Sequence, residues 1–428
     1  MTSGGNASMQ GEGSGWAGGA GHEAPGRYDV GGVLLDRPFR IRRLGHFGFN
    51  VDDVAACLEF YCEWLGLRIS DPQDLAAKHP KRDELKALGD TNLYFLRHGT
   101  DHHSFVLFNR RVFNALGRAD LLPAKVDLNQ LTWQVGSLAE VSNAIDYFAD
   151  HGIAINRVGR DMPGSNWHVY PMDPEGHRNE LYYGIEQIGW AGTAKPRAMH
   201  ERGFRQRPGL PQVGELTEVE RLLAQGIDPS SGYRHPETLP AIHDVDGVLL
   251  SRPFKVVRHG PLRLFCDDID AMAAFYVDRL GFIVSETVEW RGHRCLFLRC
   301  NTEHHSLALY PAALREALPW AGPSTVLSFG IQVATYRQLR AAVAWLQVRG
   351  CRFVDLPPAL SPGIDWYATA IDPAGHGVQL YFSMEQVGRD GLAAARPSRE
   401  LPPLAQWPAA IPATPDVYMG EAFPGPWG

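Results

Sequence analysis

The chain has 428 residues, 44% of them hydrophobic and 21% charged, a composition typical of globular proteins rather than of disordered chains, coiled coils or fibres. Its 41 Lys and Arg against 48 Asp and Glu give a net charge of -7, which disfavours the basic field of a nucleic-acid-binding protein. No run of about eighteen apolar residues and no signal-peptide pattern occurs, so we expect a cytoplasmic protein without a membrane partner. The six cysteines form no CxxC pair, which favours reduced thiols.

The first predicted elements are a strand, a helix and two further strands. IRRLGHFGFNV at 41–51 has the pattern of a short strand. A helix begins at Asp52 or Asp53, because Asp is a good N-cap, and it ends at Gly66. Two β-rich runs follow: YFLRHG at 94–99 and HHSFVLF at 102–108.

The next segment repeats this alternation. LNQLTWQVG at 128–136 reads as a strand, and SLAEVSNAIDYFADHG at 137–152 as a helix with a Ser N-cap and a terminal Gly. WHVYPMDPEGHRNELYYG at 167–184 predicts a hairpin with its turn at 173–177. Two units of strand, helix and strands indicate an α+β fold.

The whole pattern then occurs a second time. Four blocks recur in the same order, with offsets that shrink only from 215 to 199, so chance resemblance is excluded. The block pairs are VLLDRPF (33–39) and VLLSRPF (248–254), VDDVAACLEFYCEWLGL (51–67) and CDDIDAMAAFYVDRLGF (266–282), FLRHGTDHHS (95–104) and FLRCNTEHHS (297–306), and MDPEGHRNELYYGIEQIG (172–189) and IDPAGHGVQLYFSMEQVG (371–388).

The repeat predicts two tandem modules with connecting segments. We expect five parts: a flexible N-terminal segment (1–36), module one (37–190), a linker (191–251), module two (252–390) and a Pro-rich C-terminal tail (391–428). The linker contains one short helical pattern, GELTEVERLLAQG.

These blocks resemble the vicinal oxygen chelate superfamily, which includes glyoxalases, bleomycin resistance proteins and dioxygenases. The resemblance rests on LGHFGFNVDD, the FY-x3-LG helix, FLR-x3-DHHSF and DPEGHRNELYYG, and it is greatest to the type I extradiol ring-cleavage dioxygenases. It implies that each module consists of two βαβββ units, whose sheet curls around a metal-centred cavity.

The resemblance also implies a metal site in module one. In that family a His, a second His and a Glu hold Fe(II), or in some members Mn(II), and leave adjacent positions open. His46 in LGHFGF matches the first ligand and Glu180 in NELYYG matches the carboxylate. The second His is replaced by Gln130, whose amide oxygen can bind a divalent metal and serves as a ligand in related glyoxalase sites.

Three further residues are candidates for catalysis. His103 matches the catalytic His of the family, and Tyr170 a Tyr on the strand that faces Glu180. Because HHS recurs in module two, a structural, hydrogen-bonded histidine is the alternative for His103. His168 shares a strand face with Tyr170 and could replace the missing imidazole ligand or act as an acid or base. We favour Gln130 near the metal and His168 in the pocket.

Module two has lost most of this pattern. Pro261 stands opposite His46, and Gln379 opposite Glu180. Ser328 and Thr369 occupy the places of Gln130 and Tyr170, while His305 survives opposite His103. We therefore expect the metal in module one and a structural role for module two.

The resulting hypothesis is an oxidoreductase of aromatic compound catabolism: a non-haem iron dioxygenase that cleaves a catechol-like or hydroquinone-like ring with O2. Its partners would be the small aromatic substrate and O2. Two alternatives stay open: a small-molecule-binding protein without chemistry, and a glyoxalase- or isomerase-like metalloenzyme in which Gln130 is a natural ligand. The oligomeric state is also open, with a homo-oligomer as one alternative.

Overall fold

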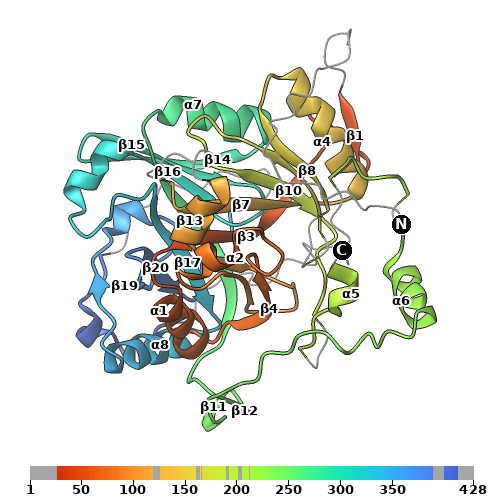
Figure 1. Cartoon of the computed structure of the whole chain (residues 1–428). Coiled ribbons are helices and arrows are strands. Elements are labelled where there is room, and N and C mark those ends of the chain that lie inside the picture. Colours follow the sequence, from red (N-terminus) through yellow and green to blue (C-terminus); the bar gives the residue numbers. More distant parts are fainter. Residues whose placement is uncertain are drawn as a thin grey trace, which may run out of the picture.

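A computed structural model describes residues 27–118, 126–160, 164, 166–188, 192–200, 205–211, 213–388 and 400–412. Residues 1–26 of the predicted flexible segment and most of the predicted tail lie outside this range. Two eight-stranded mixed sheets dominate the described part, and neither sheet closes on itself (Figure 1). The predicted α+β class and the tandem arrangement of two modules are confirmed.

Module one consists of two βαβββ units, as expected. Its sheet has the order β4-β5-β6-β3-β7-β10-β9-β8, with β3 and β7 antiparallel at the centre, and each central strand runs parallel to the last strand of its own unit. The elements are β3 (Ile41–Val51), α1 (Val54–Leu58), η1 (Glu59–Trp64), β4 (Arg68–Asp74), α2 (Arg82–Lys86), β5 (Asn92–Arg97), β6 (Phe105–Asn109), α3 (Arg110–Phe113), η2 (Asn114–Arg118), β7 (Leu128–Val135), α4 (Leu138–Asp150), β8 (Ile155–Arg160), β9 (Trp167–Pro171) and β10 (Asn179–Tyr183).

Module two repeats this topology in the order β14-β15-β16-β13-β17-β20-β19-β18. Its elements are β13 (Val256–Cys266), α7 (Ile269–Ala273), η4 (Ala274–Arg279), β14 (Ile283–Trp290), β15 (His293–Arg299), β16 (Leu307–Pro311), η5 (Ala312–Ala317), β17 (Val326–Val333), α8 (Tyr336–Val348), β18 (Phe353–Val354), η6 (Pro358–Leu360), β19 (Tyr367–Ile371) and β20 (Gly377–Tyr381).

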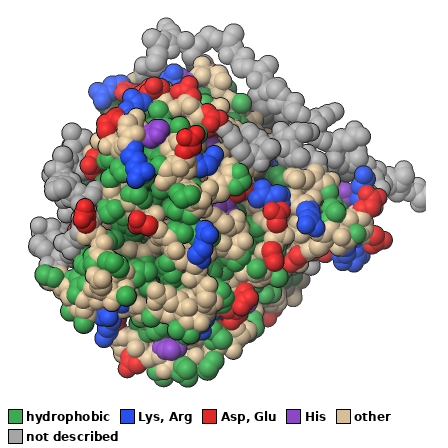
Figure 2. Space-filling model, turned by 90° about the vertical axis from the view of Figure 1, so that its left-hand side faces the viewer, with side chains coloured by type: hydrophobic (Ala, Val, Ile, Leu, Met, Phe, Trp, Pro, Cys, Tyr) green, Lys and Arg blue, Asp and Glu red, His purple; other side chains and the backbone are tan. Residues whose placement is uncertain are grey.

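The remaining described elements lie outside the two sheets. They are the hairpin β1 (Tyr28–Val30) and β2 (Val33–Leu35), α5 (Arg197–His200), α6 (Glu215–Ala224), which is the helix expected in the linker, the hairpin β11 (His243–Val245) and β12 (Val248–Leu250), and η7 (Leu404–Gln406). None of the described helices is long and apolar enough to span a bilayer. On the face shown in Figure 2, basic and acidic side chains are interspersed.

The local signals in the sequence produce the expected element ends. Asp53 caps α1 by accepting a hydrogen bond from the Ala56 amide, and Ser137 caps α4 in the same way at Glu140. After α1 the chain continues as the π-helix η1, and Gly66 at φ 84° then turns the chain toward β4.

Both modules contribute to one hydrophobic core. Phe47 on β3 packs against Phe329 on β17 with ring centroids 5.0 Å apart, and Trp133 on β7 packs edge-on against Phe282 at 4.7 Å. Because successive strand residues face opposite sides, a strand that buries Phe47 between the modules directs His46 to its other face. The interface therefore helps to orient the site.

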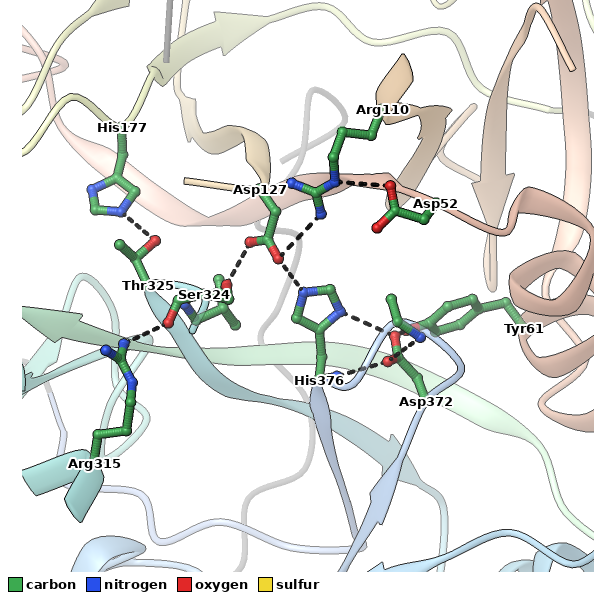
Figure 3. A network of polar contacts seen from close by, with 12 residues as sticks. Asp52, Tyr61, Arg110, Asp127, His177, Arg315, Ser324, Thr325, Asp372 and His376 are labelled. Atoms are coloured by element: carbon green, nitrogen blue, oxygen red, sulfur yellow. Dashed lines mark hydrogen bonds and ion pairs between the residues drawn. The ribbon is translucent and has the colours of Figure 1, made fainter. Parts of the chain in front are cut away.

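Polar contacts also join the modules at two related places (Figure 3). His376 Nδ1 lies 3.2 Å from Asp372 Oδ2, and its Nε2 lies 2.8 Å from Asp127 Oδ2 of module one. The corresponding histidine of module one, His177, lies between Asp173 and Thr325. The neutral hydroxyl of Thr325 thus takes the place that Asp127 has beside His376. Burial opposes a charge on His376, but the two carboxylates outweigh this and raise its pKa to about 10.

Candidate active site

The candidate site is a cavity of about 230 Å³ in module one. Its lining combines apolar side chains with polar and basic ones. The lining comprises His46, Gln73, Leu75, Leu93, Phe95, His103, Val106, Phe108, Phe113, Asn129, Gln130, Arg157, Asn166, Tyr170, Arg178, Glu180 and Arg205. Five of the six predicted site residues are in this set, and the sixth, His168, packs directly against two of them.

His46 and Glu180 face each other in the interior of this cavity. His46 Nε2 lies 3.2 Å from Glu180 Oε2, although β7 separates their strands in the sheet. Apart from this contact with each other, the two ring nitrogens of His46 and the Oε2 atom of Glu180 make no hydrogen bond within the described part of the chain. Two ligands on adjacent positions of an octahedral metal, each at about 2.1 Å, are separated by about 3.0 Å. The pair therefore fits two ligands of one metal ion.

Glu180 is held as a buried carboxylate. Burial alone would raise its pKa, but the neighbouring His46 and His168 outweigh that effect and lower the pKa below its usual value. Asn166 Nδ2 donates a hydrogen bond of 2.6 Å to Oε1 and so leaves Oε2 directed at His46. An ionised, oriented carboxylate is what a metal ligand requires.

The third ligand position depends on Gln130 and His168. Among the residues that the structure describes, no group of three or more His, Cys, Asp or Glu side chains is arranged to hold a metal. His168 Nδ1 lies 3.5 Å from Glu180 Oε1, the oxygen that points away from His46. The turn predicted at 173–177 implies that His168 lies opposite Tyr182, and the structure shows this pairing. Gln130 lines the cavity between the two predicted ligands, on β7.

Tyr170 lies at the junction of Gln130 and an arginine. Its hydroxyl donates to Gln130 Oε1 at 3.4 Å and accepts a hydrogen bond of 3.0 Å from Arg157 Nη2. The Arg157 guanidinium also lies over the Tyr170 ring, 4.4 Å from its centroid. Tyr170 is thus fixed at the cavity wall with its hydroxyl in a polar cluster, an arrangement suited to stabilising charge on a bound oxygen.

His103 lines the cavity, as expected, and His102 stands behind it. The ring of His103 lies 4.1 Å from that of His46, and its Nδ1 is 3.0 Å from His102 Nδ1. His102 Nε2 in turn lies 2.7 Å from Asp71 Oδ2. Burial lowers the pKa of His102 to about 4 and that of His103 well below its ordinary value, so both rings are neutral at pH 7.

This chain of contacts fixes the tautomers. The Asp71 carboxylate can only accept, so Nε2 of His102 carries the proton and Nδ1 of the neutral ring accepts. His103 must then donate through Nδ1, which leaves its Nε2 as a proton acceptor. Module two has the same chain of contacts, in which His305 contacts His304 and His304 contacts Glu286. A carboxylate–His–His chain therefore does not by itself require a metal site.

In module two, an arginine occupies the region that corresponds to the candidate metal position. Arg263, which stands where module one has Gly48, is fully buried. Its guanidinium donates to Gln379 Oε1 at 2.6 Å and to Ser361 Oγ at 3.3 Å. It also lies 3.4 Å from His305 Nε2 and 3.5 Å from Ser328 Oγ. Four groups that include the counterparts of Glu180, Gln130 and His103 thus surround a side-chain cation.

Sequence reasoning missed several residues of these two sites. Arg178 could have been found, because it precedes Glu180 by two residues and so shares its strand face. Asp71 sits beside a bulge that interrupts the pairing of β4 and β5, and Arg263 lies in an apolar strand, so neither shows a readable pattern. Arg157 on β8 and Asn166 just before β9 reach the site through the pairing of these two strands, which no local signal in the sequence specifies.

The fold and site define a class of protein: a duplicated βαβββ protein with a polar, ligand-bearing cavity in a curled sheet. A model of the Glyoxalase/Bleomycin resistance protein/Dioxygenase superfamily matches residues 43–181 and 258–380, more than half of the chain. The chain belongs to this superfamily, as its sequence blocks predicted.

Comparison with individual proteins gives distant relatives. The chain is 27% identical over 189 residues to metapyrocatechase 2 of Cupriavidus necator, covering 42% of this chain and 50% of that protein. It is 26% identical over 148 residues to 3-methylcatechol 2,3-dioxygenase of Pseudomonas putida F1, covering 34% and 43%. The chain thus spans about half the length of the curated relatives it matches.

Solved structures agree on the fold. A catechol 2,3-dioxygenase aligns with a TM-score of 0.50 at 15% identity, over 86% of this chain and 98% of that one. The 2,3-dioxygenase LapB of Pseudomonas sp. KL28 gives 0.51 at 14% identity, over 81% and 94%. A Mn(II)-bound glyoxalase of Novosphingobium aromaticivorans gives 0.50 at 15% identity, over 83% and 86%. At these identities the likeness shows the fold alone.

Proposed function

We propose that the protein is an extradiol-type dioxygenase that cleaves a catechol-like or hydroquinone-like ring in module one, with a non-haem Fe(II) as its metal. The observation that carries the proposal is the opposed pair of His46 Nε2 and Glu180 Oε2 at 3.2 Å, buried in a ring-sized cavity. The two curated relatives are named as enzymes that act on catechols, which supports the same kind of reaction.

His46, Glu180 and Gln130 would hold the metal. A bound Fe(II) would supply a Lewis acid with positions left open for the oxygens of the diol and for O2. Gln130 is the preferred third ligand because it lines the cavity, whereas His168 contacts the outer oxygen of Glu180. His168 then orients the carboxylate from behind, together with Asn166.

The chain's own residues supply the proton chemistry. His103, with Nε2 free of a proton, would accept a proton from a substrate hydroxyl and could return it later. Tyr170 would hydrogen-bond to the oxygen on which negative charge develops, and Arg157 behind it would strengthen that donation. The apolar wall around Phe95 and Phe108 would contact the ring and exclude water.

The contrast with module two supports the assignment of the active half. In module two the position of Glu180 holds Gln379, which accepts from the Arg263 guanidinium. Because a buried guanidinium repels a divalent cation, we infer that module two binds no catalytic metal and stabilises module one through the shared core.

Gln130 favours one rival function, a glyoxalase- or isomerase-like metalloenzyme, because an amide oxygen is a weaker ligand for Fe(II) than an imidazole. The two are distinguished by oxygen uptake. Protein purified without oxygen and reconstituted with Fe(II) or Mn(II) should consume O2 with members of a panel of catechols and hydroquinones. Stoichiometric metal without O2 consumption would favour the isomerase, and a chain that retains no metal would favour a binding protein.

A further inference from the structure

Module two has a cavity of its own at the open edge of its sheet. The cavity has a volume of about 540 Å³ and lies between the strands β18 and β19 and the segment 400–407, which includes η7. The edge strand β18 has two residues, whereas the corresponding strand β8 of module one has six. Arg263 and its four partners are not among the described lining residues, so this cavity is separate from the region that Arg263 fills.

Thr369 brings a buried polar group to this cavity. It stands on β19 where module one has Tyr170 on β9, and a threonine leaves more room on this side than a tyrosine ring does. Thr369 is 2% exposed, and within the described part of the chain its hydroxyl makes no hydrogen bond. Buried hydroxyl groups without a partner are rare, so Thr369 points to a ligand that supplies one.

Three aromatic side chains line the same cavity: Phe353, Tyr367 and Trp407. The Tyr367 hydroxyl donates to Leu356 O at 2.6 Å, and the Trp407 Nε1 donates to Pro402 O at 3.1 Å. The polar atoms of both rings are therefore already bonded within the protein. What these side chains offer to a ligand is the apolar surface of their rings.

The segment 400–407 is held in place from outside the cavity. The Trp407 ring stacks on Tyr336 of α8, with ring centroids 6.1 Å apart. The Tyr336 hydroxyl donates to Pro408 O at 2.9 Å, and Arg340 Nη1 donates to Ala409 O at 3.0 Å. The cavity is thus formed without a ligand, as small-molecule sites generally are.

The charge at this cavity is negative. Two exposed acids, Asp355 and Glu400, line it, and no Lys, Arg or His is among its described lining residues. The cavity of module one, by contrast, includes three arginines beside Glu180. Because the face of an aromatic ring attracts a cation, the rings and the carboxylates of module two favour the same sign of charge in a ligand.

We propose that this cavity is a second ligand site, which binds a protonated arylalkylamine that carries an N–H on its ring system. The ammonium group would lie near Asp355 and Glu400, the ring system would pack against the aromatic side chains, and its N–H would donate to the Thr369 hydroxyl oxygen. The volume of about 540 Å³ is within the range of small-molecule pockets. The inference goes beyond the proposed function, because neither the metal nor ring cleavage enters it.

The first test measures the contribution of the ammonium group by isothermal titration calorimetry at pH 7. Tryptamine should bind about 5- to 30-fold more tightly than tryptophol, which has a hydroxyl in place of the ammonium. The double variant Asp355→Asn, Glu400→Gln should bring the two affinities to within about twofold of each other. Glu316→Gln, at an exposed glutamate of η5 outside the described lining, is the matched control and should keep the native preference.

The second test concerns the Thr369 hydroxyl. The native protein should bind tryptamine several-fold more tightly than 1-methyltryptamine, which has no ring N–H, because a buried hydrogen bond is then lost. Thr369→Val keeps the shape of the side chain and removes the hydroxyl, so it should bind the two compounds about equally.

These measurements also define the results that would overturn the inference. It is wrong if no indole compound binds, if tryptamine and tryptophol bind equally, or if the double variant keeps the native preference. If Thr369→Val does not fold, equal binding of tryptamine and 1-methyltryptamine by the native protein would still refute the role of Thr369. Reconstitution with Fe(II) should leave the affinity for tryptamine unchanged; an affinity that depends on the metal would place the binding in module one and contradict a site in module two.

Discussion

The charged contact between the modules allows a quantitative prediction about pH and stability. His376 is fully buried between Asp127 and Asp372, and its pKa is raised to about 10 from an ordinary value near 6.5. A group whose pKa is raised by folding adds stability that is complete below the unfolded pKa and is lost as the pH rises toward the folded pKa. At about 1.36 kcal/mol per pKa unit, the contribution reaches about 4–5 kcal/mol near pH 6 and falls below about 1 kcal/mol near pH 9.5.

Asp127→Asn tests this reasoning because it removes one charge and keeps the size of the side chain. The variant should lose about 2–4 kcal/mol in the free energy of unfolding at pH 6, where it removes part of a buried charge network. At pH 9.5 the loss should shrink to about 1 kcal/mol, because Asp127 then contacts only the neutral imidazole, Ser324 and the partly exposed Arg110. Urea unfolding of both proteins at several pH values measures the difference.

The control uses the neutral counterpart of Asp127. Thr325→Val removes the hydroxyl that contacts His177 and should cost a similar amount at both pH values, because Thr325 does not titrate. If Asp127→Asn loses as much stability at pH 9.5 as at pH 6, His376 is not the charged partner and the interpretation of this contact is wrong.

Three further predictions concern the site. Glu180→Ala should abolish binding of Fe(II), whereas Gln379→Ala in module two should leave metal content unchanged; equal losses would contradict the choice of module one. Gln130→His should tighten Fe(II) binding, measured by competition with a chelator, because imidazole suits iron better than an amide oxygen. If His168 is the ligand instead, His168→Ala should lose roughly tenfold or more in Fe(II) affinity, while Gln130→Ala should bind Fe(II) as the native protein does. Gly45→Ala should destabilise the protein by about 1–3 kcal/mol in thermal unfolding, because the added Cβ would lie 2.2 Å from a ring atom of the buried Tyr182, next to His46; a wild-type melting temperature would refute this.

The sequence predicted the pair His46 and Glu180 because both residues match ligand positions in the family motifs, and strand alternation directs both side chains to the same face of the sheet. It placed the hairpin register correctly because the DPEGH turn fixes which residues oppose each other. It left open whether Gln130 or His168 completes the site, because the direction of the His168 side chain depends on the neighbours that pack around its ring. Nor did it find Asp71, whose contact with His102 depends on an irregular strand pairing.

The two modules differ most in how each satisfies the polar groups at its centre. In module two, Arg263 contacts Gln379, Ser361, Ser328 and His305, so the chain itself supplies the cation and its hydrogen-bond partners.

In module one the same region has Gly48 in place of the arginine, and a Cβ there would come within 2.6 Å of Val106. Apart from the contact of His46 Nε2 with Glu180 Oε2, these atoms and His46 Nδ1 have no hydrogen-bond partner in the described ranges. Buried polar groups without partners are rare, because each costs about 1–3 kcal/mol. A fold that closes this region internally in one copy, and leaves an imidazole and a carboxylate facing each other in the other copy, is best explained if module one takes its cation from outside the chain.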